Sequence, residues 1–235
     1  MFDELFVSTQ YAPDPELEPL VEVYPELSGA IAGFASSTES RTGKYVLLDV
    51  GGLTLDCVFF SLNKDDASGS RYAVYAADIC RYGAEIVKYW ISTTDHAEAE
   101  AASALGNFFA ETVLRAHDKI PRIYYGNREV REVPALLTGG GRQSAPHRNA
   151  PEWAQTHLAN STSAVRLPVT DLAPFRTDMD VPLLFGEDIS RLLVASGLSR
   201  FRTEIPTWTT SKDVRDATPV MTRDFGDYFV GPEQT

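Results

Sequence analysis

The stretch that decides the fold runs from Lys44 to Leu62 and reads KYVLLDVGGLTLDCVFFSL. Tyr45 to Val50 is a continuous apolar run closed by an acid, a pattern typical of a buried strand. Gly51 and Gly52 then predict a turn. The β-branched and aromatic residues from Leu53 to Leu62 predict a strand that returns beside the first. The stretch therefore predicts a hairpin with a glycine-rich tip.

A third strand and two helices are predicted after this hairpin. Residues 63–70 (NKDDASGS) predict a loop, and Arg71 to Cys80 (RYAVYAADIC) predicts a strand that completes a three-stranded meander. A helix is predicted to begin at Gly83 and to reach Ile91. A longer helix is predicted from Asp95 to His117, where apolar residues recur at helical spacing.

Shorter elements are predicted on both sides of the meander. They are a strand at Leu20–Tyr24, a helix of small residues at Glu26–Ser36, a hairpin at Ile123–Val133, a buried strand at Val133–Thr138, a helix at Pro151–Leu158, a strand at Ala164–Leu167 and a helix at Asp188–Ser196. Gly197 is predicted to cap the last helix in a left-handed conformation. From Thr203 the chain is polar and patternless until Phe225. This order of strands and helices predicts an α/β fold.

Charge and composition exclude several classes of function. The 235 residues carry a net charge of -12, and hydrophobic residues make up 43%, enough for a substantial core. Residues 1 to 40 hold eight acids and no Lys or Arg, so that Arg41 is the first basic residue. A strongly acidic chain is a poor match for the phosphate backbone of nucleic acids, which favours basic patches. We therefore expect no nucleic-acid partner.

Membrane, disulfide and metal classes are also disfavoured by the sequence. No run of about 18 apolar residues is present, and the acidic start MFDELFVSTQ lacks the basic region of a signal peptide. We expect a soluble cytoplasmic protein with no membrane partner. Cys57 and Cys80 lie in apolar stretches and predict two buried free thiols. The histidines show no metal-ligand spacing; they are His96, His117, His147 and His157.

The octamer Asp49 to Asp56 (DVGGLTLD) is the first candidate site. Glycines let backbone N–H groups approach an anion closely, and Thr54 adds a hydroxyl donor. Asp49 could hold the hydration shell of Mg²⁺, an ion that keeps several waters and needs few protein carboxylates. The alternative is a tight turn between two strands, with both aspartates as solvated strand ends.

Two further stretches are candidates. The buried strand at Leu136–Thr138 runs into Gly139-Gly140-Gly141, which allow close approach of a flat or anionic ligand, and Arg142 could stack on a base. The alternative is a flexible loop between strand and helix. Glu26 follows Pro25 and could orient a water for attack on a phosphoryl group. The alternative there is a glutamate favoured at a helix start by the helix dipole.

Taken in this order, the glutamate, the phosphate hairpin and the glycine-rich loop resemble the second lobe of the actin-like ATPase superfamily. That group includes actin, the seventy-kilodalton heat-shock chaperones, sugar kinases and plasmid-segregation filament proteins. The resemblance covers about residues 20 to 200. DVGGLTLD looks like the chaperone hairpin with Leu53 in place of a third glycine, a change that plasmid-segregation actins tolerate, and Pro25-Glu26 looks like the plasmid type. RLLVASGLS at Arg191–Ser199 resembles the closing helix of the chaperone-like members.

The resemblance implies a ribonuclease-H-like lobe, a mixed sheet flanked by helices, that binds ATP and Mg²⁺. It implies phosphate binding by Gly51, Gly52, Leu53 and Thr54. It implies adenosine binding by Gly139, Gly140, Gly141 and Arg142, although Arg142 lies one position early for the base-stacking arginine of the chaperones. Catalysis would depend on Glu26 and on Asp49, the residue implied to hold the metal.

Members of this superfamily have two lobes with nucleotide between them, and the 25 residues before Glu26 cannot supply a first lobe. We expect an acidic lead-in at 1–19, the lobe at 20–202 and a tail at 203–235, with RDFGDYFV (223–230) as an aromatic anchor. ATP would be hydrolysed only if a first lobe completes the site. The chain is then a chaperone-like or filament-like ATP-binding lobe. The alternative is a non-catalytic binding or assembly module, or a degenerate remnant, that needs a partner. That partner would be a separately encoded first lobe, and self-association is also expected as an option.

Overall fold

We describe the protein from a computed structural model. The residues described are 26–37, 40–64, 71–95, 97–120, 131–159, 165–171, 193–199 and 207–210. The helices are α2 (Glu26–Ala35), α3 (Ala84–Thr93), α4 (Ala97–Lys119), α5 (Ala145–Ala159) and α6 (Leu193–Leu198). The strands are β1 (Gly43–Val50), β2 (Leu55–Asn63), β3 (Arg71–Cys80), β4 (Arg131–Glu132), β5 (Ala135–Thr138), β6 (Val165–Arg166), β7 (Val169–Asp171) and β8 (Thr207–Thr210).

The main sheet confirms the expected fold class. Its six strands lie in the order β7-β5-β1-β2-β3-β8. β1, β2 and β3 form the antiparallel meander, while β5 runs parallel to β1 and β7 parallel to β5. An antiparallel meander extended by parallel strands beside its first strand is the mixed sheet expected of a ribonuclease-H-like lobe. β4 and β6 form a separate two-stranded parallel sheet.

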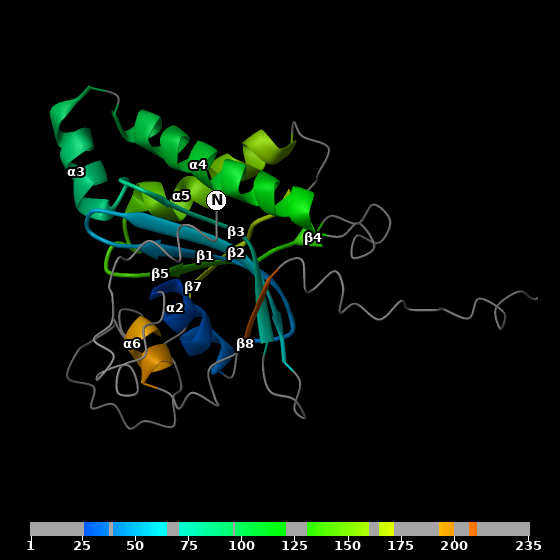
Figure 1. The fold of residues 1–235 in the computed structure, drawn as a ribbon. Helices are drawn as coiled ribbons and strands as arrows, with labels where there is room; N and C mark the ends of the chain where they lie inside the picture. The colour runs from blue at the N-terminus through cyan, green and yellow to red at the C-terminus, as the bar shows by residue number, and fades with distance from the viewer. Residues whose placement is uncertain are drawn as a thin grey trace, which may run out of the picture.

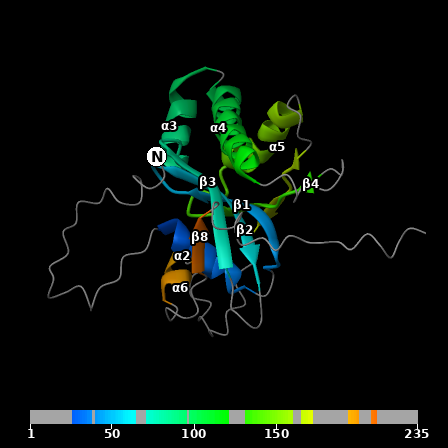
Figure 2. The ribbon, with the colours of Figure 1, turned by 45° about the vertical axis from the view of Figure 1, so that its right-hand side comes forward.

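Helices cover both faces of the main sheet, as Figures 1 and 2 show from two directions. α3, α4 and α5 lie on one face, and α2 and α6 lie on the other. Each face has its own hydrophobic core. Along β1, Val46 and Leu48 enter the first core, whereas Tyr45 and Leu47 enter the second. Burial on both faces explains why the stretch Tyr45–Leu48 of β1 is continuously apolar instead of alternating.

The contact between α2 and α6 corrects the interpretation of Gly197. This glycine was expected to end a helix in a left-handed conformation, but it lies inside α6, and Gly139 is the glycine with a positive φ among the described residues. A Cβ on Gly197 would overlap the carbonyl oxygen of Gly29 and lie 2.7 Å from the backbone nitrogen of Gly33. Gly197 therefore allows α2 and α6 to approach each other closely. On α2 the contact is made by two more glycines, Gly29 and Gly33.

Replacing Gly197 with Ala is expected to lower the free energy of unfolding by about 2–4 kcal/mol, because the added methyl group has no space against α2. Urea denaturation measures the effect. Ala195→Ser is the matched control, since Ala195 is exposed in the same helix. A Gly197→Ala protein as stable as this control would show that α6 does not pack on α2 as described.

Other element boundaries differ from the sequence prediction. α5 begins at Ala145, six residues before the Pro151 at which a helix was predicted to start. The reason is that the Ser144 carbonyl already accepts a hydrogen bond from the Arg148 N–H at 3.0 Å. The short edge strands β7 and β8 were missed. β8 lies in the stretch expected to be patternless and pairs with the start of β3.

Several predictions fall on residues outside the described ones. They are the acidic lead-in at 1–19, the strand at 20–24, most of the hairpin at 123–133, the first part of the helix at 188–196 and the segment RDFGDYFV at 223–230. The described part of the expected hairpin, Arg131–Glu132, forms β4 and pairs with β6 instead. Both cysteines are free, as predicted; Cys57 is buried and Cys80 is half-buried.

Candidate functional site

The turn between β1 and β2 is anchored from behind by the start of α3. The Gly51 N–H donates to the Thr54 carbonyl at 2.9 Å, which closes the turn. The first backbone groups of α3 then donate to the turn carbonyls: Ala84 N–H to Gly51 and Glu85 N–H to Gly52, both at 2.9 Å. These hydrogen bonds satisfy donors that a helix start leaves unpaired. The turn is thus held rigidly beside the end of β1.

The second turn follows β5, which is paired with β1 so that Thr138 lies beside Asp49. Gly139 has a φ of +84°, and a Cβ there would collide with the Asp49 carboxylate and lie 2.5 Å from the Val50 carbonyl oxygen. The Gly141 N–H donates to that same carbonyl at 2.8 Å. Glycine is therefore required at 139 by conformation and by space.

These two turns line one cavity of about 450 Å³ at the end of β1. The volume lies within the range of small-molecule sites. α2 supplies Glu26 from the opposite side of the sheet and α3 supplies Glu85. The described residues of the lining are Glu26, Asp49, Gly51, Gly52, Ala84, Glu85, Thr138, Gly139, Gly140, Gly141 and Val194. Residues from five separate stretches of the sequence thus meet at one cavity.

The cavity is acidic: Glu26, Asp49 and Glu85 line it, and none of the described residues of its lining is a Lys or an Arg. The pKa of Asp49 is raised from 3.8 to about 6. Burial is the largest cause, and the nearby charges of Glu26 and Asp56 contribute the rest. Burial and Glu26 also raise the pKa of Asp56, against a hydrogen bond from the Thr54 hydroxyl. Among the described lining residues no positive side chain faces this carboxylate, and a bound cation would supply a counter-charge.

Not every residue of the predicted site lines the cavity. Leu53 projects from the turn with 66% of its surface exposed, and the Thr54 hydroxyl is engaged with Asp56. Arg142 is buried and lies outside the lining. Their binding roles stay predictions. Glu26, Asp49, Gly51, Gly52 and the three glycines after β5 do meet at the cavity.

Sequence reasoning missed Thr138, Glu85 and Val194. Thr138 is the polar residue between the apolar strand and the glycines. Its place at the end of a predicted strand was a signal in the sequence that it lies at the site. Glu85 follows Gly83 at the start of a predicted helix, but only the hydrogen bonds between α3 and the turn bring it to the site. Val194 arrives through the packing of α6 on α2, which no local pattern reveals.

Among the described residues, no cluster of three or more His, Cys, Asp or Glu side chains is arranged to hold a metal ion. None of the described helices is both long enough and apolar enough to cross a membrane.

Comparison with known proteins gives fold neighbours only. No protein family and no curated protein matches the sequence. A PilM–PilN type IV pilus biogenesis complex matches over 76% of this chain at 16% identity and a TM-score of 0.34, and the match spans 52%, about half, of that chain. The activator of 2-hydroxyisocaproyl-CoA dehydratase from Clostridium difficile, with bound ADPNP, matches over 83% of this chain and 69% of its own, at 12% identity and a TM-score of 0.31.

Component A of (R)-2-hydroxyglutaryl-CoA dehydratase from Acidaminococcus fermentans matches over 77% of this chain and 69% of its own, at 10% identity and a TM-score of 0.30. All three likenesses are weak, with TM-scores of 0.30 to 0.34 and identities of 10 to 16%.

Proposed function

We propose that this chain binds ATP together with Mg²⁺ in the acidic cavity at the end of β1, as the ATP-binding lobe of an actin-family ATPase. The observation that carries the proposal is the meeting of two glycine-rich turns from neighbouring strands around one carboxylate, with Glu26 lining the same cavity. Ligands of open α/β sheets bind beyond the carboxyl ends of the strands, which is where this cavity lies.

The lining fits a metal-bridged phosphate better than a bare one. Glu26, Asp49 and Glu85 would repel a free polyphosphate. The N–H groups of Gly51 and Gly141 already donate to protein carbonyls. Oxygen ligands and few carboxylates suit Mg²⁺, which keeps most of its water shell. The raised pKa of Asp49 supports the fit, because a cation there would relieve an uncompensated carboxylate.

The proposed roles follow from position. Mg²⁺, when bound, would neutralise phosphate charge and orient the phosphates. Asp49 would accept hydrogen bonds from water of the metal shell, and Gly52 would let the phosphates approach, since a Cβ at Gly52 would meet only the Glu85 side chain at 3.8 Å. Glu26 would orient the attacking water. Gly139 and Gly140 would lie against the adenosine.

The acidic lining also supports the alternative of an incomplete site. A triphosphate needs positive groups around its transferred phosphate, as in phosphoryl-transfer enzymes generally, and the described part of the lining supplies none. We infer that a partner surface, a separate first lobe or a second copy, would bring those groups. The isolated chain would then bind ATP weakly and hydrolyse it negligibly, as a non-catalytic binding module.

Titration calorimetry of the full chain tests the proposal. We expect ATP with Mg²⁺ to bind with a dissociation constant of about 0.1 to 1 mM, and ATP in EDTA to give no heat of binding. Phosphate release should stay at the rate measured without protein. Tight binding that survives Asp49→Ala would overturn the assignment of this cavity, and so would binding that is unaffected by removal of Mg²⁺.

A further inference from the structure

His147 is a buried polar side chain that the proposed chemistry does not use. Its ring is 1% exposed. Nε2 lies 2.6 Å from the Tyr82 carbonyl oxygen, and Nδ1 lies 2.8 Å from the Ser144 hydroxyl. A carbonyl oxygen only accepts, so Nε2 carries the proton, and Nδ1 of the neutral ring accepts from Ser144. Both ring nitrogens are therefore engaged by named partners.

Each partner adjoins one of the two turns that line the cavity, and we call each turn with its adjoining segment one wall of the site. Tyr82 directly precedes Gly83, Ala84 and Glu85, whose N–H groups donate to the carbonyls of the β1–β2 turn. Ser144 ends the glycine-rich turn after β5, and its N–H donates to the Gly141 carbonyl at 2.9 Å. The imidazole therefore spans the two segments that stand directly behind the two turns.

The two walls also lie in close contact with each other. A Cβ on Gly141 would lie 2.5 Å from the Ala84 Cβ and 2.6 Å from Val50 Cγ1. The Tyr82 ring stacks on Trp90 of α3, with ring centroids 6.3 Å apart. A small shift of the Tyr82 backbone would therefore move the start of α3, and with it the hydrogen bonds that hold the β1–β2 turn.

We propose that His147 is a positioning residue of the nucleotide site, whose Nε2–H to the Tyr82 carbonyl fixes the β1–β2 turn relative to the glycine turn after β5. The inference rests on the proposed function, because it assigns these two turns to one ligand. Nε2 is the essential atom, since it reaches across to the other wall. Nδ1 bonds only to Ser144, three residues away on the same wall.

The neutral form of the ring suits this role. Burial lowers the pKa of His147, against a smaller opposite effect of the Tyr82 carbonyl. The ring also lies in the first turn of α5 (Ala145–Ala159), where the helix dipole disfavours a positive charge. The Nε2–H donor is thus permanently available at neutral pH.

Two substitutions separate the two ring nitrogens. The amide of His147→Gln places a donor near the position of Nε2 and keeps the reach to Tyr82, whereas the shorter amide of His147→Asn reaches only the position of Nδ1. Ser144→Ala removes the Nδ1 partner alone. The measurement is amide hydrogen exchange by NMR on the full chain without nucleotide, followed by calorimetric titration with ATP and Mg²⁺.

In His147→Asn we expect the amides of Gly83, Ala84 and Glu85 to exchange at least about fivefold faster than in the wild type, the effect of one lost neutral hydrogen bond. The amides of Leu105 and Phe109, buried in α4, serve as the internal reference and should not change. His147→Gln and Ser144→Ala should exchange like the wild type at all these positions. Affinity for Mg²⁺ and ATP should fall about fivefold in the Asn variant only.

Faster exchange at the α4 reference amides by the same factor would show general destabilisation and overturn the positioning role. Unchanged exchange in His147→Asn would do the same, and so would equal acceleration in the Gln and Asn variants. If the wild-type chain binds no nucleotide, the proposed function fails and the ligand part of this inference fails with it. The exchange measurement, made without nucleotide, still decides whether His147 holds the turn.

Discussion

Replacing Asp49 with Asn is expected to raise the free energy of unfolding of the ligand-free protein by about 3 kcal/mol above pH 7, because the folded protein raises the pKa of this carboxyl from 3.8 to about 6. Asn keeps the shape of Asp and removes the buried charge beside Glu26 and Asp56. The same substitution should weaken binding of ATP with Mg²⁺ by at least about tenfold, since it removes the carboxylate proposed to hold the metal shell.

The sign of the pH dependence follows from the direction of the Asp49 shift. Below pH 3.8 the carboxyl is protonated in both the folded and the unfolded chain and contributes nothing. Between 3.8 and about 6 the folded chain binds more protons than the unfolded chain, so the wild type loses stability relative to Asp49→Asn as the pH rises. The stability difference should be small at pH 4, grow through pH 5 and be complete above pH 7.

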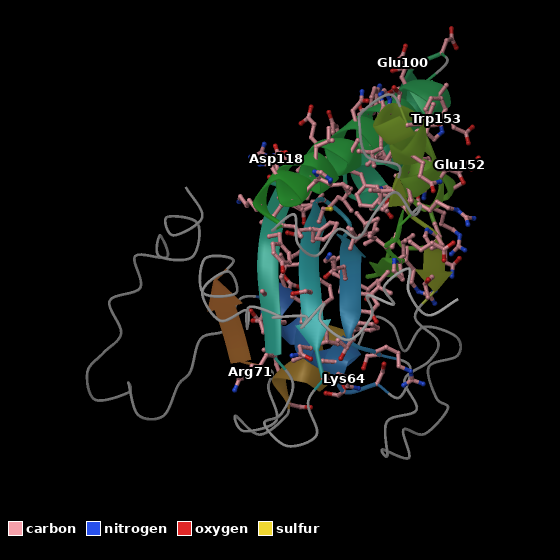
Figure 3. The ribbon with its side chains drawn as sticks, turned by 90° about the vertical axis from the view of Figure 1, so that its right-hand side faces the viewer. Lys64, Arg71, Glu100, Asp118, Glu152 and Trp153 are labelled. Carbon is pink, nitrogen blue, oxygen red and sulfur yellow. The ribbon has the colours of Figure 1, made fainter. Side chains whose placement is uncertain are left out.

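Urea denaturation in EDTA at these pH values measures the difference. Glu152→Gln is the control for removal of a carboxylate, because Glu152 lies exposed on the outer side of α5, away from the sheet (Figure 3). It should leave both stability and binding unchanged. An Asp49→Asn protein that is no more stable than the wild type at pH 7.5 would show that Asp49 is not held as an uncompensated buried charge.

Replacing Gly139 with Ala is expected to cost about 3 kcal/mol of stability, from the left-handed backbone together with the collision of the new methyl group. The φ of +84° is unfavourable for any residue with a Cβ. The methyl group would also press on the Asp49 carboxylate and on the Val50 carbonyl. Binding of ATP with Mg²⁺ should be lost even at temperatures where the variant stays folded.

Gly52→Ala is the matched control, since a Cβ at Gly52 would meet only Glu85 Cγ at 3.8 Å. It should stay as stable as the wild type within about 1 kcal/mol. The comparison uses thermal and urea unfolding of both variants. If Gly139→Ala were as stable as Gly52→Ala, the glycine-rich turn after β5 would not have the backbone described here.

The sequence predicted the centre of the fold well because it is built from local patterns. The continuous apolar run of β1 and the tip Gly51-Gly52 identify the hairpin, and the helical spacing from Asp95 to His117 identifies α4. The short edge strand β8 has no such pattern. Its pairing with β3 is a tertiary effect, and Thr207–Thr210 carries no signal that separates it from loop.

Site residues were predictable where motif and strand end coincide. Asp49 and the glycines after β5 follow buried strands, and the parallel pairing of β1 and β5 brings them together. Glu85 and His147 act through hydrogen bonds to backbone carbonyls of distant segments. No spacing in the sequence encodes those partners. The misreading of Gly197 has a similar cause, since a glycine that caps a helix and one that packs between helices look alike in one sequence.

The measurement that tests the central claim most directly is an NMR titration of the full, isotope-labelled chain with ATP and Mg²⁺. The account predicts that the amide signals of Gly51, Gly52, Gly139 and Gly140 shift together as nucleotide is added. Signals of Asp118 and Glu152, on the outer helices in Figure 3, should stay in place. Saturable shifts that leave both glycine turns unchanged, or no shifts at millimolar nucleotide, would contradict the assignment of this cavity as a nucleotide site.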